Sequence, residues 1–94
     1  MQKQSTRAWV PLGRVVATPG ALEALEEAEL MSLLRRHQAG DWGEVGKQDW
    51  EENELSLREG YRLLSSYTAQ RGRKVWIITE ADRSVTTFLL PEEY

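Results

Sequence analysis

The spacing of hydrophobic residues is helical in the first half of the chain. Over residues 21–38 leucines recur three and four positions apart in a segment rich in Ala, Leu and Glu, which predicts an amphipathic helix. Thr18 suits its N-cap and Pro19 its first position. Glu29 interrupts the apolar stripe, so a break near residues 26–29, which would give two short helices, is an alternative.

A further helix is predicted after a glycine-containing loop. Asp49 followed by Glu52 has the spacing of a capping box with Asp as the cap, and Gly60 suits the C-terminal end. Only Trp50 and Leu57 share an apolar face of this segment. Because this stripe is thin, we expect the helix to pack at one edge of the domain.

From residue 61 the pattern changes to the period of two that is typical of strands. Strands are predicted over residues 61–68, 75–79 and 85–90, joined by short polar turns. The segment 75–79 is almost entirely apolar, which predicts a central strand covered on both faces. A short strand is also predicted over residues 13–17, before the first helix.

This order of elements predicts an α+β fold, with an N-terminal strand and two or three helices packed on an antiparallel C-terminal β-meander. A chain of 94 residues suits one domain, which we place at residues 9–94, after a flexible N-terminal arm at residues 1–8. The meander leaves at least one free sheet edge, so a homodimer is a further hypothesis. The side chains expected in the core are Leu25, Leu33, Leu34, Trp76, Ile78 and Leu89.

The composition narrows the classes of function. The chain has no cysteine, which excludes disulfides, zinc–thiolate sites and cysteine nucleophiles. It has no apolar run of membrane-spanning length and no signal-peptide core, so we expect a cytoplasmic protein that does not bind membranes. The net charge of −3 gives no general attraction to nucleic acid. Residues 19–57 nevertheless carry a net charge of −7 and residues 58–74 one of +4, and either patch could steer a partner.

His37 is the only histidine, and therefore the only side chain with an ordinary pKa near neutrality. At a helix end that faces the sheet it could act as a general acid or base, and the alternative is a helix C-terminal cation without chemistry. Asp41 and Trp42, in the loop that follows, are candidate binding residues. One histidine with scattered carboxylates supplies no convincing ligand set, so we expect no metal, and no nucleotide-binding motif implies a cofactor.

The densest polar cluster joins the two strongest predicted strands, at residues 79–87. One interpretation is an anion or phosphodiester site, in which Arg83 keeps a free, charged fork. The other is a hairpin turn in which Asp82 accepts from backbone amides. The catalytic candidates are His37, Glu80, Arg83 and Thr87, and the binding candidates in the cluster are Arg83 and Thr86.

The stretches HQAGDWG, EENELSLREGYRLLSSY and KVWIITEADRSVTTFLLPEEY resemble a small bacterial family of plasmid-related and hypothetical proteins. The resemblance covers residues 13–94 and implies a protein of a mobile element, such as a plasmid or prophage, without implying a reaction. In layout the chain is also similar to ribonuclease folds of the RelE, barnase and colicin type. That similarity implies metal-independent RNA cleavage on the sheet surface by the catalytic candidates named above.

Two hypotheses follow, from different classes of function. The first is a non-enzymatic binding or accessory module with a protein partner, which acts through the sheet or the acidic helices. The second is a metal-independent ribonuclease, which would bind nucleic acid. The net charge of −3 and the single histidine favour the first, because ribonuclease toxins of this kind are usually basic. Convergence of His37, Arg83 and a carboxylate on one concave patch would distinguish the two.

Overall fold

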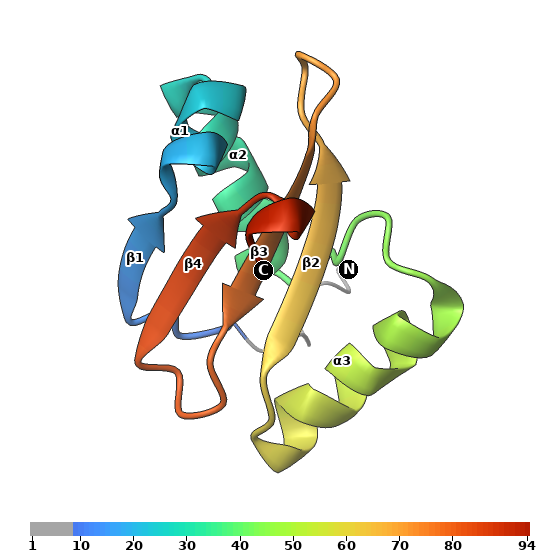
Figure 1. The fold of residues 1–94 in the computed structure, drawn as a ribbon. Coiled ribbons are helices and arrows are strands. Elements are labelled where there is room, and N and C mark those ends of the chain that lie inside the picture. The colour runs from blue at the N-terminus through green and yellow to red at the C-terminus, as the bar shows by residue number, and fades with distance from the viewer. Residues whose placement is uncertain (1–8) are drawn as a thin grey trace, which may run out of the picture.

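Four strands form one mixed sheet with the order β1-β4-β3-β2 in the computed structural model, which describes residues 9–94 (Figure 1). The strands are β1 (Arg14–Ala17), β2 (Leu63–Thr68), β3 (Lys74–Thr79) and β4 (Val85–Leu89). The last three form the predicted antiparallel meander, with β3 between its neighbours. The proposed arm at residues 1–8 lies outside the described residues.

The strand β1 departs from the predicted antiparallel arrangement, because it pairs parallel to β4. Its ladder is continued at both ends, where Arg14 N–H donates to Ser84 O and Thr18 N–H donates to Phe88 O. All of the larger helices lie between β1 and the meander in the chain, and such a long connection allows parallel pairing. The predicted α+β class is confirmed, with a mixed sheet.

The first predicted helix is divided in two, which was the alternative left open by the sequence. α1 (Pro19–Ala24) begins with Thr18 as its N-cap and ends at Leu25, whose backbone is extended; α2 (Glu27–Gln38) follows. Arg71, from the β2–β3 turn, fills this break: it donates to Glu23 O at the end of α1 and pairs with Glu26. A cation suits the carbonyl end of a helix.

The last long helix, α3 (Lys47–Glu59), begins three residues earlier than the capping-box spacing predicted. Gly46 is the N-cap, and its carbonyl accepts from Trp50 N–H. Asp49 therefore lies within the first turn, where its carboxylate favours the helix dipole without capping it. The predicted C-terminal end at Gly60 is confirmed, with φ 83°.

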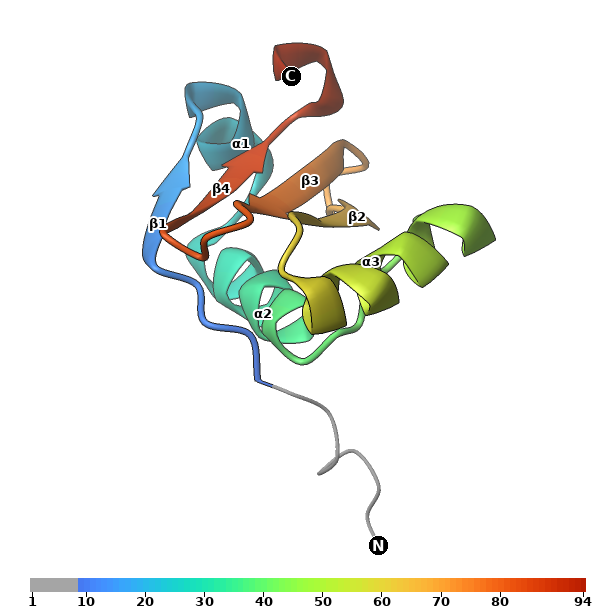
Figure 2. The same ribbon diagram turned by 90° about the horizontal axis from the view of Figure 1, so that it is seen from below.

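The core lies between the helices and one face of the sheet, as Figure 2 shows for α2 and α3. Paired residues share a face, so Tyr67, Val75, Ile77 and Phe88 point together towards the helices, where they pack with residues of α1 and α2. Five of the six predicted core residues are buried, namely Leu25, Leu33, Leu34, Ile78 and Leu89.

Trp76 is the exception among the predicted core residues, because it is only half-buried. It lies on the face of β3 opposite to Val75 and Ile77, and no long helix of residues 9–94 covers that face (Figure 2). Its ring packs edge-on against Tyr94, with ring centroids 5.8 Å apart. The C-terminal residues, beside the short 3-10 helix η2 (Pro91–Glu93), thus supply the only aromatic contact that the described structure gives Trp76. The prediction that β3 is fully covered on both faces is therefore too strong.

The two edges of the sheet differ in how far other segments cover their backbone groups. On the outer side of β2, the Asn53 amide of α3 bonds both backbone groups of Leu64, at 2.7 and 3.1 Å. Further along the strand, Ser66 N–H donates to Trp42 O, and Ser66 O accepts from Glu44 N–H. The loop comes this close because Gly43, with φ 74°, has no Cβ, which would lie 2.2 Å from Ser66 O. The β2 edge is therefore closed over most of its length, whereas β1 lies at the opposite edge.

Candidate functional site

His37 is fully buried at the end of α2 and takes part in a chain of polar side chains that crosses three strands. Its Nδ1 atom lies 2.6 Å from Ser65 Oγ of β2, and its Nε2 atom lies 2.9 Å from Thr79 Oγ1 of β3. The chain continues from Thr79 Oγ1 to Thr86 Oγ1 of β4 at 2.7 Å and ends at Leu12 O, 2.7 Å further on. All three hydroxyl residues are buried on the helix-facing side of the sheet.

The direction of each hydrogen bond in this network follows from the acceptor at its end, Leu12 O. Leu12 O can only accept, so the Thr86 hydroxyl donates to it and accepts from Thr79. With its single proton directed at Thr86, the Thr79 hydroxyl must accept from His37 Nε2–H. His37 Nδ1 is then the acceptor for Ser65 Oγ–H. The network therefore fits a neutral imidazole with its proton on Nε2.

The surroundings also oppose a charge on His37. Burial, together with the positive charge of Arg83, lowers the pKa of His37 from 6.5 to about 4. The ring of Trp42 meets the imidazole edge-on at a centroid distance of 5.7 Å. His37 is consequently neither the helix-end cation nor the accessible general acid or base considered from the sequence. It is a neutral core residue that joins α2 to the sheet.

Arg83 does not keep the free fork expected from the sequence. Its Nη1 atom lies within hydrogen-bond distance of Tyr61 O, Glu80 O and Ala81 O, at 2.7, 3.1 and 3.2 Å, and its Nη2 atom donates to Ser56 O at 3.1 Å. Ser56 belongs to the last turn of α3, so the guanidinium neutralises the carbonyl end of that helix. Arg83 thereby ties the β3–β4 turn to the α3–β2 connection, and the expectation of a free fork is wrong.

The rest of the β3–β4 turn fits the second interpretation of this cluster, a hairpin turn in which Asp82 accepts from a backbone amide. Asp82 Oδ1 accepts from Ser84 N–H at 3.0 Å, and hydrogen bonds from Ser84 lower the pKa of Asp82. The Arg83 backbone has φ 62°, which is unusual for a residue other than glycine. Glu80 is exposed, and its side chain makes no hydrogen bond or ion pair with the described residues 9–94.

The remaining candidates do not join this turn in one site. Thr86 is fully buried in the chain with His37, whereas Thr87, the next residue along β4, points to the opposite face of the sheet. Trp42 is also fully buried, and its indole N–H donates to Glu54. Asp41 accepts from Arg36 Nε and Gly43 N–H, and these bonds lower its pKa. The candidate residues mostly hold the fold together, and they form no common concave patch.

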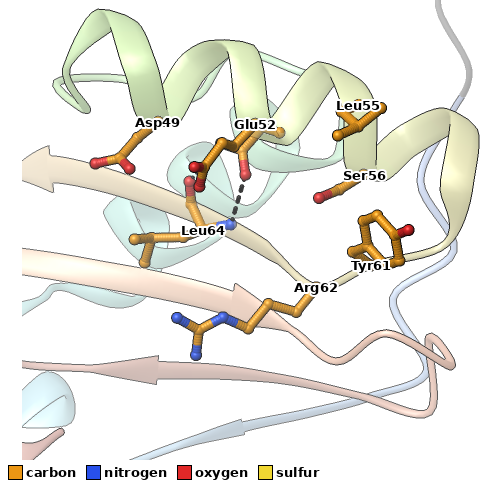
Figure 3. Close-up of a pocket in the computed structure, with 8 residues that line it drawn as sticks. Asp49, Glu52, Leu55, Ser56, Tyr61, Arg62 and Leu64 are labelled. Atoms are coloured by element: carbon orange, nitrogen blue, oxygen red, sulfur yellow. Dashed lines mark hydrogen bonds between the residues drawn. The ribbon is translucent and has the colours of Figure 1, made fainter.

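A hollow that the sequence did not indicate lies between α3 and the start of β2 (Figure 3). We call it the α3 groove; it has a volume of about 310 Å³. Asp49 and Glu52 stand at one end, and Leu55, Ser56 and Tyr61 gather towards the other. Its lining residues are Asp49, Glu52, Asn53, Leu55, Ser56, Tyr61, Arg62 and Leu64.

The α3 groove combines acidic groups that have no partner in the described part of the chain with exposed apolar surface. Neither Asp49 nor Glu52 has a hydrogen-bond or ion-pair partner among residues 9–94. Leu55 is 39% exposed and Tyr61 is 55% exposed. Arg62 is held in place, because its Nη1 atom donates to Tyr94 Oη at 2.5 Å. The sequence signal for this site was the excess of acidic residues over residues 19–57, but Asp49 and Glu52 were interpreted as a capping box.

A second hollow, between α2 and the β2–β3 hairpin, differs in its charged groups. There Glu26 pairs with Arg71, Arg36 pairs with Asp41, and one carboxylate oxygen of Glu29 accepts from Gln70 N–H. The other oxygen of Glu29 is buried and has no hydrogen-bond partner among residues 9–94. Because each charged side chain there already has a partner in the protein, we regard the α3 groove as the better binding surface.

No cluster of three or more metal-binding side chains occurs in the described part of the chain, and no helix in that part is long and apolar enough to cross a membrane. No protein-family model, curated protein or solved structure matches this chain. The α3 groove and the buried polar network around His37 must therefore be interpreted from their own chemistry.

Proposed function

We propose that this protein is a non-enzymatic binding module that receives a protein segment in the α3 groove. The observation that carries the proposal is a pair of carboxylates, Asp49 and Glu52, that have no partner among residues 9–94 and lie beside the exposed side chains of Leu55 and Tyr61. Accessible apolar area provides affinity and fixed charges provide selectivity in such sites. The resemblance to plasmid-related proteins supports the further proposal that the module serves a bacterial mobile element.

The charge of α3 indicates the kind of partner. The helix carries two basic and five acidic side chains, a net charge of −3. A segment with a Lys or Arg followed by an apolar residue would place its cation at Asp49 and Glu52 and its apolar side chain near Leu55 and Tyr61. The partner we propose is therefore a basic, partly apolar protein segment.

The same charges do not favour nucleic acid as the partner. Phosphates would be repelled by the carboxylates of the α3 groove. In the basic stretch of residues 58–74, Arg71, Arg73 and Lys74 are each paired with a glutamate. The ribonuclease alternative also lacks support from geometry, since His37 is enclosed in the core.

A peptide-display selection on the wild-type protein tests this proposal. We expect the selected peptides to be enriched in Lys or Arg beside Leu, Ile or Phe. In fluorescence anisotropy, Glu52→Lys should weaken their binding by about tenfold or more, because a charge contact of about 1.4 kcal/mol corresponds to that factor. Glu51→Lys is the matched control, since Glu51 is exposed on the same helix but does not line the α3 groove.

Two results would contradict the proposal. One is a selection without basic enrichment, and the other is equal weakening by Glu52→Lys and Glu51→Lys. A labelled RNA oligonucleotide, incubated under the same conditions, provides the comparison for the ribonuclease alternative: we expect neither binding at the α3 groove nor cleavage.

A further inference from the structure

No other strand of residues 9–94 pairs with the outer edge of β1. In the parallel pairing with β4, Arg14 and Thr18 donate inwards to the carbonyls of Ser84 and Phe88. Residues alternate in such a ladder, so the N–H and C=O groups of Val15 and Ala17 point away from the sheet. Among residues 9–94, no backbone group bonds to them on that side. Within residues 9–94, the sheet is thus closed over most of β2 and available for pairing at β1.

We propose that two copies of this chain pair through β1, antiparallel, about a twofold axis at Val16. In this arrangement Val15 of one copy lies opposite Ala17 of the other. Because both residues direct their backbone groups outwards, each of the two such pairs forms two hydrogen bonds. The dimer would contain one continuous eight-stranded sheet, built from the two four-stranded sheets.

The backbone at the two ends of β1 favours this register over its neighbours. An axis at Val15 would place Ala17 opposite Gly13, which has φ 63° and is not extended. An axis at Ala17 would place Val15 opposite Pro19, which has no N–H to donate. Only the axis at Val16 pairs both outward-facing residues of β1, Val15 and Ala17, with an extended residue that has its own outward N–H and C=O groups.

The side chains suit a second copy of the same strand. Val16 is 37% exposed and would meet its symmetry mate on the face that no long helix covers. Arg14 would lie opposite Thr18 of the other copy, on the same face. Thr18 Oγ1 donates to Glu93 Oε1 at 2.6 Å, so this position brings the Arg14 guanidinium near a carboxylate. Such charge complementarity supports a second copy as the occupant of this edge.

Single cysteines provide a sharp test, because the natural chain has none. In Val16→Cys the two thiols would meet at the axis in a non-hydrogen-bonded pair, with Cα atoms about 4.5 Å apart, which a disulfide can bridge. In Val15→Cys the two cysteines would be diagonal neighbours with Cα atoms about 7–8 Å apart, which is too far for a disulfide. The two valines are almost equally exposed, at 37% and 39%. We expect rapid oxidative cross-linking of Val16→Cys and little of Val15→Cys.

Equal cross-linking of the two variants, or faster cross-linking of Val15→Cys, would overturn the proposal. A second measurement does not depend on how the cysteine variants fold. Sedimentation velocity of the wild-type protein at high micromolar concentration should show a dimer, Arg14→Glu should weaken it, and Arg14→Lys should retain it. A wild-type protein that remains monomeric would also overturn the proposal. These outcomes are independent of the α3 groove, which lies at the β2 edge.

Discussion

The polar chain around His37 and the α3 groove differ in what surrounds their polar groups. His37, Ser65, Thr79 and Thr86 are buried and bonded to one another in a fixed sequence. Asp49 and Glu52 face solvent beside exposed apolar side chains and have no partner within residues 9–94. Reactive residue types therefore do not by themselves locate a site. Here the only histidine is a packed core residue, whereas two ordinary carboxylates are exposed to solvent.

The largest effect that separates the two regions should come from Thr79→Val, which preserves shape but removes the central hydroxyl. His37 Nε2–H would then be a buried donor without an acceptor, and such a loss costs roughly 1–3 kcal/mol. Thr87→Val is the matched control, because Thr87 lies on the other face and its hydroxyl has no partner among residues 9–94. Urea denaturation should show a clear loss for Thr79→Val and almost none for Thr87→Val. Equal effects would show that the hydrogen-bond network around His37 does not stabilise the core.

A smaller loss is expected for Arg83→Ala, because the four carbonyl oxygens near the guanidinium would lose their donor. Hydrogen bonds to a partly exposed charged group suggest a cost of roughly 1–2 kcal/mol. Arg83→Gly should be less destabilising than Arg83→Ala, since glycine adopts φ 62° without strain. The measurement is thermal and urea unfolding of both variants. An Arg83→Ala protein as stable as the wild type would restore the view that this side chain serves a ligand.

The smallest effect on stability is expected in the α3 groove. Glu52→Lys removes no hydrogen bond or ion pair among the described residues, so its free energy of unfolding should change by less than about 0.5 kcal/mol. Combined with the loss of peptide binding proposed above, this would make Glu52 a residue of recognition alone. A large destabilisation by Glu52→Lys would remove the contrast between the two regions.

Local rules predicted much of the fold, and long-range contacts explain where they failed. Thr18 caps α1 and Gly60 ends α3 as the sequence indicated, because caps depend on a few neighbouring residues. The break between α1 and α2 is held by Arg71, which lies 45 positions from Glu26. Likewise, the parallel pairing of β1 depends on β4, far along the chain. Neither partner is visible in a local pattern.

The candidate site was predicted less well than the fold, for a related reason. His37 and Arg83 were chosen for the chemistry of their side chains, and both are occupied by partners that are distant in sequence, such as Thr79 and Tyr61. Asp82 could be predicted as a turn residue because its partner, Ser84, is two positions away. Whether a polar group is open or closed depends on tertiary contacts, and residue type does not contain that information.

The burial of His37 also makes the stability of the protein depend on pH. Its pKa is about 4 in the folded protein, below the ordinary value of 6.5, so the unfolded chain binds the proton more readily as the pH falls. The stability contributed by the neutral ring is therefore present above pH 6.5 and is lost between about pH 6.5 and 4, by up to about 3 kcal/mol. The pKa values of Asp41 and Glu44 are lowered from already acidic values, so their contribution is lost at more acidic pH. His37→Gln should remove the slope between pH 6.5 and 4.

Nitrogen-15 NMR of the His37 ring as a function of pH is the decisive measurement for the buried polar network, because it observes the protonation of each ring nitrogen. The structure predicts one neutral form, with the proton on Nε2 and an acceptor Nδ1, which persists as the pH is lowered until about pH 4. A ring that titrates near pH 6.5, with rapid exchange between its two neutral forms, would contradict the claim. It would return His37 to the set of residues available for chemistry.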